Sequence, residues 1–67
     1  MFNKDNIDTF KGSKITYKTI NNGNLCKYTL KGVERVTEDF ATVKVIDNEE
    51  LLFKTLHFAN ITLGHSE

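Results

Sequence analysis

The stretch Leu25-Cys26-Lys27-Tyr28-Thr29-Leu30-Lys31-Gly32-Val33 (residues 25–33) alternates apolar and polar side chains and changes phase at its glycine. Cys26, Tyr28 and Leu30 fall on one face, and polar side chains fall on the other. Such period-2 alternation predicts a β-strand. The one-residue slip at Gly32 predicts a bulge or sharp bend inside that strand. Small barrels need such a bend, because one long strand serves both halves of the sheet.

The same alternation extends from Lys11 to Leu63, without a convincing helical repeat. Turn-forming residues interrupt it at 21–24 (Asn-Asn-Gly-Asn), at 38–39 (Glu-Asp), at 47–50 (Asp-Asn-Glu-Glu) and at 59–60 (Ala-Asn). The strands expected between these turns cover residues 14–20, 25–36, 40–46, 51–58 and 61–63. We therefore predict a mainly β fold, a single small five-stranded and strongly bent antiparallel barrel.

The two ends of the chain carry weaker patterns. Residues 1–10 contain cap-type residues, and Ile7 and Phe10 lie three positions apart, as on one side of a helical turn. We expect this segment to form a helical turn that covers an open end of the barrel, or else a flexible tail. Residues 11–63 are then the barrel and residues 64–67 a tail.

Length and composition limit the class of protein. The chain has 67 residues, which is room for one domain with a marginal core. Cys26 is the only cysteine, so no intrachain disulfide can form and a cytoplasmic location is expected. No signal-type segment or apolar run of spanning length is present, so we expect no membrane association. Abundant Asn, Lys, Ile and Thr favour an AT-rich coding sequence, such as that of a low-GC bacterium or a phage.

The charges balance, with nine basic and nine acidic residues. Nucleic-acid-binding modules usually carry a basic excess, which is missing here. Pairing the first two strands would nevertheless gather lysines into one basic patch, and the candidates for nucleic-acid contact are Lys14, Lys18, Lys27 and Lys31. The alternative interpretation is that these lysines keep the outer face soluble and discourage edge pairing.

Two stretches carry a resemblance to a known family. The segment 11–17 (Lys-Gly-Ser-Lys-Ile-Thr-Tyr), a glycine hairpin, and the segment 28–34 (Tyr-Thr-Leu-Lys-Gly-Val-Glu) together resemble the first part of Sm-like barrels. The stretch 56–61 (Leu-His-Phe-Ala-Asn-Ile) is similar to the connector into their last strand. The chain also resembles the small carboxyl-terminal barrel of ribosome maturation factors, and SH3-like barrels share the same spacing. The resemblance implies a five-stranded barrel that works by binding.

The chain departs from the Sm-like pattern where that family holds nucleotides. Sm-like RNA binders place an Asp, an apolar residue and an Asn around the loop between strands 2 and 3, whereas residues 34–42 here are longer, more acidic and lack the Asn. Ala59-Asn60 also replaces the basic element before the last strand. The resemblance therefore does not extend to uridine-type RNA binding in a ring.

No set of residues predicts an enzyme. Cys26 is in phase with buried neighbours and has no base beside it in the sequence, which favours a small apolar core residue over a nucleophile. His57 and His65 have no Cys or carboxylate partner at a familiar metal spacing. We therefore predict no catalytic residues, no metal or other cofactor, and no small-molecule substrate.

Apolar residues crowd the last two strands beyond what one face of a small barrel hides. The candidates for protein contact are Leu52, Phe53, Leu56, Phe58 and Ile61. A core that consumes them all is the alternative. Our leading hypothesis is a non-enzymatic binding module, a small regulatory or accessory protein, phage-encoded or bacterial, that acts by protein–protein contact or as a homo-oligomer. The second hypothesis is an Sm-like barrel that binds RNA or single-stranded nucleic acid.

Overall fold

The computed structural model describes residues 1–65, so that part of the predicted tail 64–67 lies outside the described residues. The strands and 3-10 turns, in chain order, are η1 (Ile7–Phe10), β1 (Lys14–Lys18), β2 (Leu25–Val36), β3 (Phe40–Asp47), β4 (Glu50–His57), η2 (Phe58–Asn60) and β5 (Ile61–Leu63). Within these residues the prediction of a mainly β fold with five antiparallel strands is confirmed. No helix in the described part of the chain is long and apolar enough to span a membrane.

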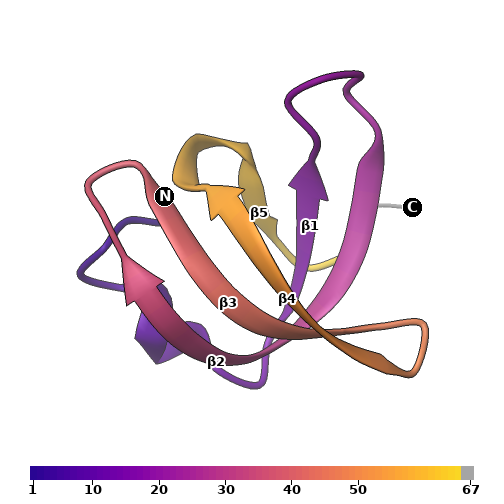
Figure 1. Ribbon diagram of the computed structural model, residues 1–67, viewed down its shortest axis with the longest axis horizontal. Helices are drawn as coiled ribbons and strands as arrows, with labels where there is room; N and C mark the ends of the chain where they lie inside the picture. Colours follow the sequence, from indigo (N-terminus) through magenta and orange to yellow (C-terminus); the bar gives the residue numbers. More distant parts are fainter. Residues whose placement is uncertain (66–67) are drawn as a thin grey trace.

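All five strands belong to one sheet in the order β4-β3-β2-β1-β5. The sheet is strongly bent, and the long strands β2 and β3 curve together around the core (Figure 1). β4 and β5 form no ladder with each other, so they are the two edges of an unclosed sheet. The break in hydrogen bonding between them is called the seam below.

β2 is irregular at Gly32, where the sequence pattern predicts a bulge or bend. The register of β2 against β3 shifts between Leu30 and Gly32, which confirms the predicted irregularity at that glycine. A second shift, between Val33 and Arg35, was not predicted. Each shift places an extra residue on β2 and increases the local twist, so the strand can pair with β1 at one end and β3 along the other.

The core lies on the concave side of the sheet. Ile15, Leu30, Val43 and Val45 are fully buried there, in the phase that the alternation predicts. The complete buried cluster also contains Phe2, Ile7, Tyr17, Tyr28, Ala41, Leu56, Phe58 and Ile61. The amino-terminal segment therefore contributes two core side chains and a short 3-10 turn instead of a loose tail.

The turn between β3 and β4 fixes the phase of both strands. Asp47 pairs with Glu50, which leaves Asn48 and Glu49 as the two turn residues. Their φ angles are 53° and 70°, in the left-handed region. Two successive positive φ values are typical of a type I′ hairpin, whose twist matches that of the flanking strands.

Candidate interaction surfaces

The backbone of β4 presents free hydrogen-bonding groups at one edge of the sheet. The Phe58 N–H donates to the Asp39 carbonyl at 2.9 Å, in the same register that pairs β3 with β4. In an antiparallel ladder, hydrogen-bonded and non-bonded pairs alternate. Leu52, Lys54 and Leu56 therefore direct their backbone groups toward β3. The residues between them direct theirs away from the sheet, and the β4 edge is defined here as the backbone groups of Leu51, Phe53 and Thr55.

The same three residues direct their side chains to the convex side of the sheet. Leu51 is 54% exposed and Phe53 is 59% exposed. The Lys44 amino group lies 5.8 Å from the centroid of the Phe53 ring, and Thr42 and Thr55 share a hydrogen bond of 3.0 Å between their hydroxyls. These contacts with β3 order the convex side of β4, and they leave both the apolar surface and the edge accessible.

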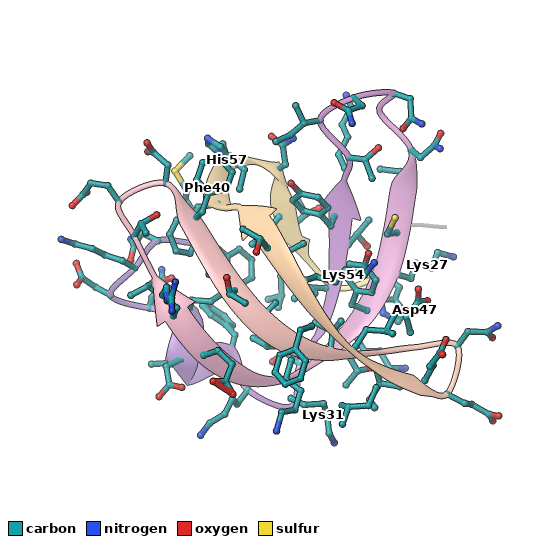
Figure 2. All side chains as sticks on the ribbon, in the orientation of Figure 1. Lys27, Lys31, Phe40, Asp47, Lys54 and His57 are labelled. Carbon is teal, nitrogen blue, oxygen red and sulfur yellow. The ribbon has the colours of Figure 1, made fainter. Side chains whose placement is uncertain are left out.

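The concave side of β4 carries a lysine between two leucines. Leu52, Lys54 and Leu56 pair with inward-facing positions of β3, and Lys54 lies opposite the fully buried Val43. The Lys54 side chain is half-buried on β4 (Figure 2). Among the described residues, no ion pair or hydrogen bond engages its amino group. An inward-pointing charge on an edge strand opposes indiscriminate strand pairing.

At its carboxyl end β4 is bonded across the seam. The His57 N–H donates to the Tyr17 hydroxyl of β1 at 3.2 Å, and the His57 ring accepts from the Ala59 N–H at Nδ1. The same ring lies edge-on to Phe40, with centroids 4.8 Å apart (Figure 2). His57 therefore ends the accessible part of the edge and starts η2, and its role is structural.

β5 is the shorter edge, and side chains fasten it to β1. It has three residues. The Thr16 hydroxyl donates to the Gly64 carbonyl at 2.7 Å, the Thr62 hydroxyl donates to the Thr16 carbonyl at 3.3 Å, and the Gly64 N–H donates to the Lys14 carbonyl. A strand this short offers few free groups to another chain.

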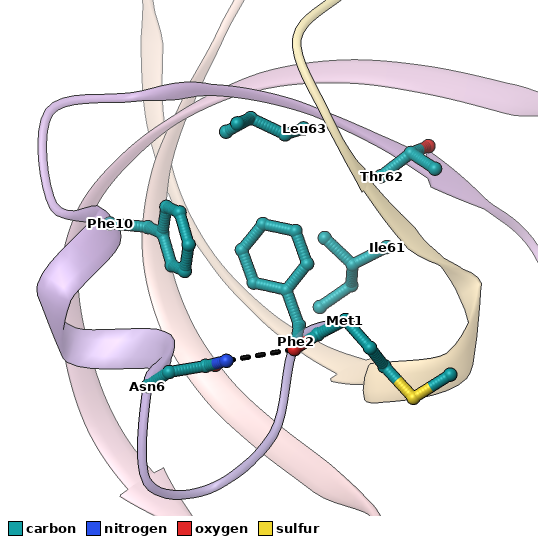
Figure 3. Close-up of a pocket in the computed structure, with 7 residues that line it drawn as sticks. All are labelled: Met1, Phe2, Asn6, Phe10, Ile61, Thr62 and Leu63. Atoms are coloured by element: carbon teal, nitrogen blue, oxygen red, sulfur yellow. Dashed lines mark hydrogen bonds between the residues drawn. The ribbon is translucent and has the colours of Figure 1, made fainter.

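The amino-terminal segment lies beside β5 and leaves a small apolar hollow there. The rings of Phe2 and Phe10 contact each other at a tilt of 52°, with centroids 4.6 Å apart, and they line the hollow together with Ile61 and Leu63 (Figure 3). The hollow has a volume of about 230 Å³. The Asn6 side-chain amide donates to the Met1 carbonyl at 2.8 Å and closes one side. The hollow is open, and apolar side chains make up most of its lining.

The predicted lysine patch forms on the convex side of β1 and β2. Lys14, Lys18 and Lys27 occupy outward positions on these paired strands, and the exposed Lys31 follows at the first β2 bulge. No Asp or Glu occurs between residues 9 and 33, although the whole chain is neutral. The charges are therefore segregated: the carboxylates of the described residues lie in the amino-terminal segment, at or beside the turns and, in the case of Glu34, in the second half of β2. The overall balance hides this separation.

The predicted protein-contact residues divide between the core and the surface. Leu56 is 2% exposed, and Phe58 and Ile61 are also buried in the core. Leu52 is half-buried beside Lys54, and only Phe53 is largely exposed. Leu51 and Lys54 are not among the predicted contact residues. A two-residue turn that pairs residue 47 with residue 50 would have predicted their orientation. It places residues 52, 54 and 56 opposite inward positions of the preceding strand, so Lys54 faces inward and Leu51 faces outward.

The ionisable groups of the concave side form no metal site. Among the described residues, no three His, Cys, Asp or Glu side chains gather as metal ligands.

Burial raises the pKa of Tyr28, and its hydrogen bond with Cys26 and the nearby Asp47 charge raise it further. Cys26 is half-buried against the core. Tyr28 is therefore neutral in the fold.

Comparison with protein-family models, with curated proteins and with solved structures finds no significant match to this chain.

Proposed function

We propose that the protein is a non-enzymatic binding module that acts by protein contact, adding an extended strand of another chain, or of another copy, to the β4 edge. The bent sheet works as an open barrel of the Sm-like or SH3-like kind, and the added strand lies in the seam. The observation that carries the proposal is the register of β4 against β3, which turns the backbone groups of Leu51, Phe53 and Thr55 away from β3 on an eight-residue edge strand.

Strand addition suits this edge energetically. Main-chain hydrogen bonds give such complexes affinity, and side chains on alternate positions give them specificity. Leu51 and Phe53 are more than half exposed beside the edge. Burying a side chain of this size contributes about 1.5–3 kcal/mol. By contrast, β5 is short and is flanked by the amino-terminal segment, so β4 is the edge that receives the partner.

A strand-forming probe peptide tests the proposal. The peptide Thr-Val-Thr-Gln-Thr-Val-Thr reads the same in both directions and carries no charged side chain. Titrated into the labelled protein to millimolar concentration, it is expected to perturb the backbone amides of Leu51, Phe53 and Thr55. Light scattering on the protein alone measures self-association in parallel.

Two variants at Phe53 distinguish the contribution of its backbone N–H to strand addition from that of its side chain. Phe53→Pro removes an N–H that points away from β3, so the fold survives and strand addition is lost. Phe53→Thr keeps the N–H and a strand-forming residue, so strand addition is retained. Equal binding by both variants, or a wild-type protein that binds neither the peptide nor itself, contradicts the proposed function.

The lysine patch supports a second candidate function, contact with RNA or single-stranded nucleic acid. Its specific support is the absence of carboxylates from residues 9–33, which leaves β1 and the part of β2 that pairs with it without a negative side chain in a neutral protein. Binding of an oligonucleotide through this patch falls steeply as salt increases. The double variant Lys14→Glu, Lys27→Glu is expected to abolish it, whereas Lys54→Glu preserves it. A titration without measurable binding at low salt rejects this candidate.

A further inference from the structure

The concave side of β4 indicates what kind of strand fits the seam. A strand added to the β4 edge turns alternate side chains toward the core, next to Leu52, Lys54 and Leu56. Directly opposed side chains in antiparallel strands lie about 4.5–5.5 Å apart and interact in pairs. The inward residues of the partner therefore lie next to an apolar side chain (Leu52), a cationic one (Lys54) and a second apolar one (Leu56).

Lys54 has no counter-charge of its own in the described residues. The two ion pairs there join Lys4 to Glu38 and Lys11 to Asp8, far from β4 in the chain. Asp47 and Glu50 share the concave side of the hairpin, at its turn, but form no ion pair with Lys54. An added strand would cover the half-buried Lys54 side chain further, and covering its charge without a partner is costly.

We propose that the occupant of the seam is an extended segment of another protein whose inward face reads apolar, acidic, apolar, with its carboxylate on Lys54. This inference rests on the proposed function and specifies the partner's chemistry. One inward apolar side chain packs on the half-buried Leu52, the acidic one supplies the charge that Lys54 lacks, and the other apolar side chain lies at the edge of the core next to the buried Leu56. Because the pair lies in a partly desolvated position, it discriminates strongly between partner strands.

A second copy of this chain satisfies the requirement poorly. The β5 strand of another copy would offer Ile61 and Leu63 on its inward side, without a carboxylate. The β4 strand of another copy would bring a second Lys54 into the same seam, and like charges oppose pairing. Charge complementarity therefore selects a different protein.

The experiment compares three probe peptides that differ only at the central residue, Thr-Val-Thr-X-Thr-Val-Thr with X as Glu, Gln or Lys. The Glu peptide is expected to bind about tenfold more tightly than the Gln peptide, and the Lys peptide more weakly still. Lys54→Glu reverses this order. Lys27→Glu, an equal charge change on the convex side of β2, keeps the original order. Circular dichroism checks that each variant is folded.

Each of the following outcomes overturns the inference about the partner strand, and one of them also overturns the proposed function. Equal affinity of the Glu and Gln peptides at the β4 edge overturns the carboxylate requirement and leaves the proposed function intact. An equal response of Lys27→Glu and Lys54→Glu shows general attraction and also overturns it. A homodimer with protected β4 amides makes a second copy the occupant, against the inference. Binding of no peptide by a monomeric protein overturns both proposals. If Lys54→Glu does not fold, the order of the three peptides on the wild-type protein decides.

Discussion

The two edge strands of the sheet, β4 and β5, lie on either side of the seam. They differ in length, in how much of the chain packs beside them, and in the side-chain hydrogen bonds that hold them to the neighbouring strand. β5 has three residues, hydroxyl bonds to β1 and the amino-terminal segment beside it. β4 has eight residues, a single neighbouring strand, and two exposed apolar side chains along its free groups. Of the two edges, β4 is therefore the one that the described part of the chain leaves more accessible to an added strand.

The largest expected effect separates the two sides of β4. Leu56→Ala removes a fully packed core side chain and is expected to lower the free energy of unfolding by about 3 kcal/mol. Leu51→Ala, on the convex side, lowers it by about 0.5 kcal/mol or less. Urea denaturation measures both. Similar losses for the two variants contradict the assignment of inward and outward positions. A charge at Leu56 or Phe58 would accordingly unfold the protein instead of testing association.

The next effect tests which backbone groups of β4 are free. Lys54→Pro deletes an N–H that bonds to β3 opposite Val43, and the loss of that bond together with local strain costs about 2 kcal/mol. Phe53→Pro deletes an N–H at the β4 edge and costs about 1 kcal/mol or less. Thermal unfolding compares the two. If Phe53→Pro is the more damaging variant, the edge has been assigned in the wrong phase.

A smaller effect is expected at β5. Thr16→Val removes the hydroxyl that donates to the Gly64 carbonyl, and the free energy of unfolding falls by about 1 kcal/mol. Backbone amide exchange in β5 should accelerate more than exchange in β4, because the lost bond fastens that strand. Unchanged exchange at β5 would mean that its short ladder and the amino-terminal segment hold it without this hydroxyl.

The smallest effect concerns alkaline pH. The pKa of Tyr28 is raised in the fold above its unfolded value of about 10. Its contribution to stability is therefore present below pH ~10 and is lost as pH rises toward the folded pKa, because the unfolded chain releases the proton first. The unfolding midpoint should be insensitive to Tyr28 ionisation at neutral pH. Tyr28→Phe should reduce the alkaline decline, and an identical decline in both proteins contradicts burial of this hydroxyl.

The sequence predicted the fold better than the surfaces, for a physical reason. The strands from Lys14 to Asp47 alternate cleanly, and Gly32 marks the bend, so period and phase were both readable. In β4 the consecutive Leu51-Leu52-Phe53 are all apolar, so the period gives no phase there. The phase comes from the turn, in which Asn48 and Glu49 both take positive φ although neither is glycine.

The covering of the core was also only partly predictable. Phe2 packs in the core from the second position of the chain, where no repeat exists to place it. The lysine patch was predicted from strand pairing, and the absence of Asp and Glu from residues 9–33 can be read from the sequence alone. The unclosed seam depends on which strands meet, and a single sequence does not reveal that.

Amide hydrogen exchange along β4, without and with the Glu peptide, tests strand addition most directly. In the free monomer, Leu51, Phe53 and Thr55 should exchange rapidly while Leu52, Lys54 and Leu56 are protected by β3. With the peptide bound, the first three should become protected as well. Slow exchange at all six positions in the free monomer, or peptide binding that leaves Leu51, Phe53 and Thr55 unprotected, would contradict a partner strand at the β4 edge.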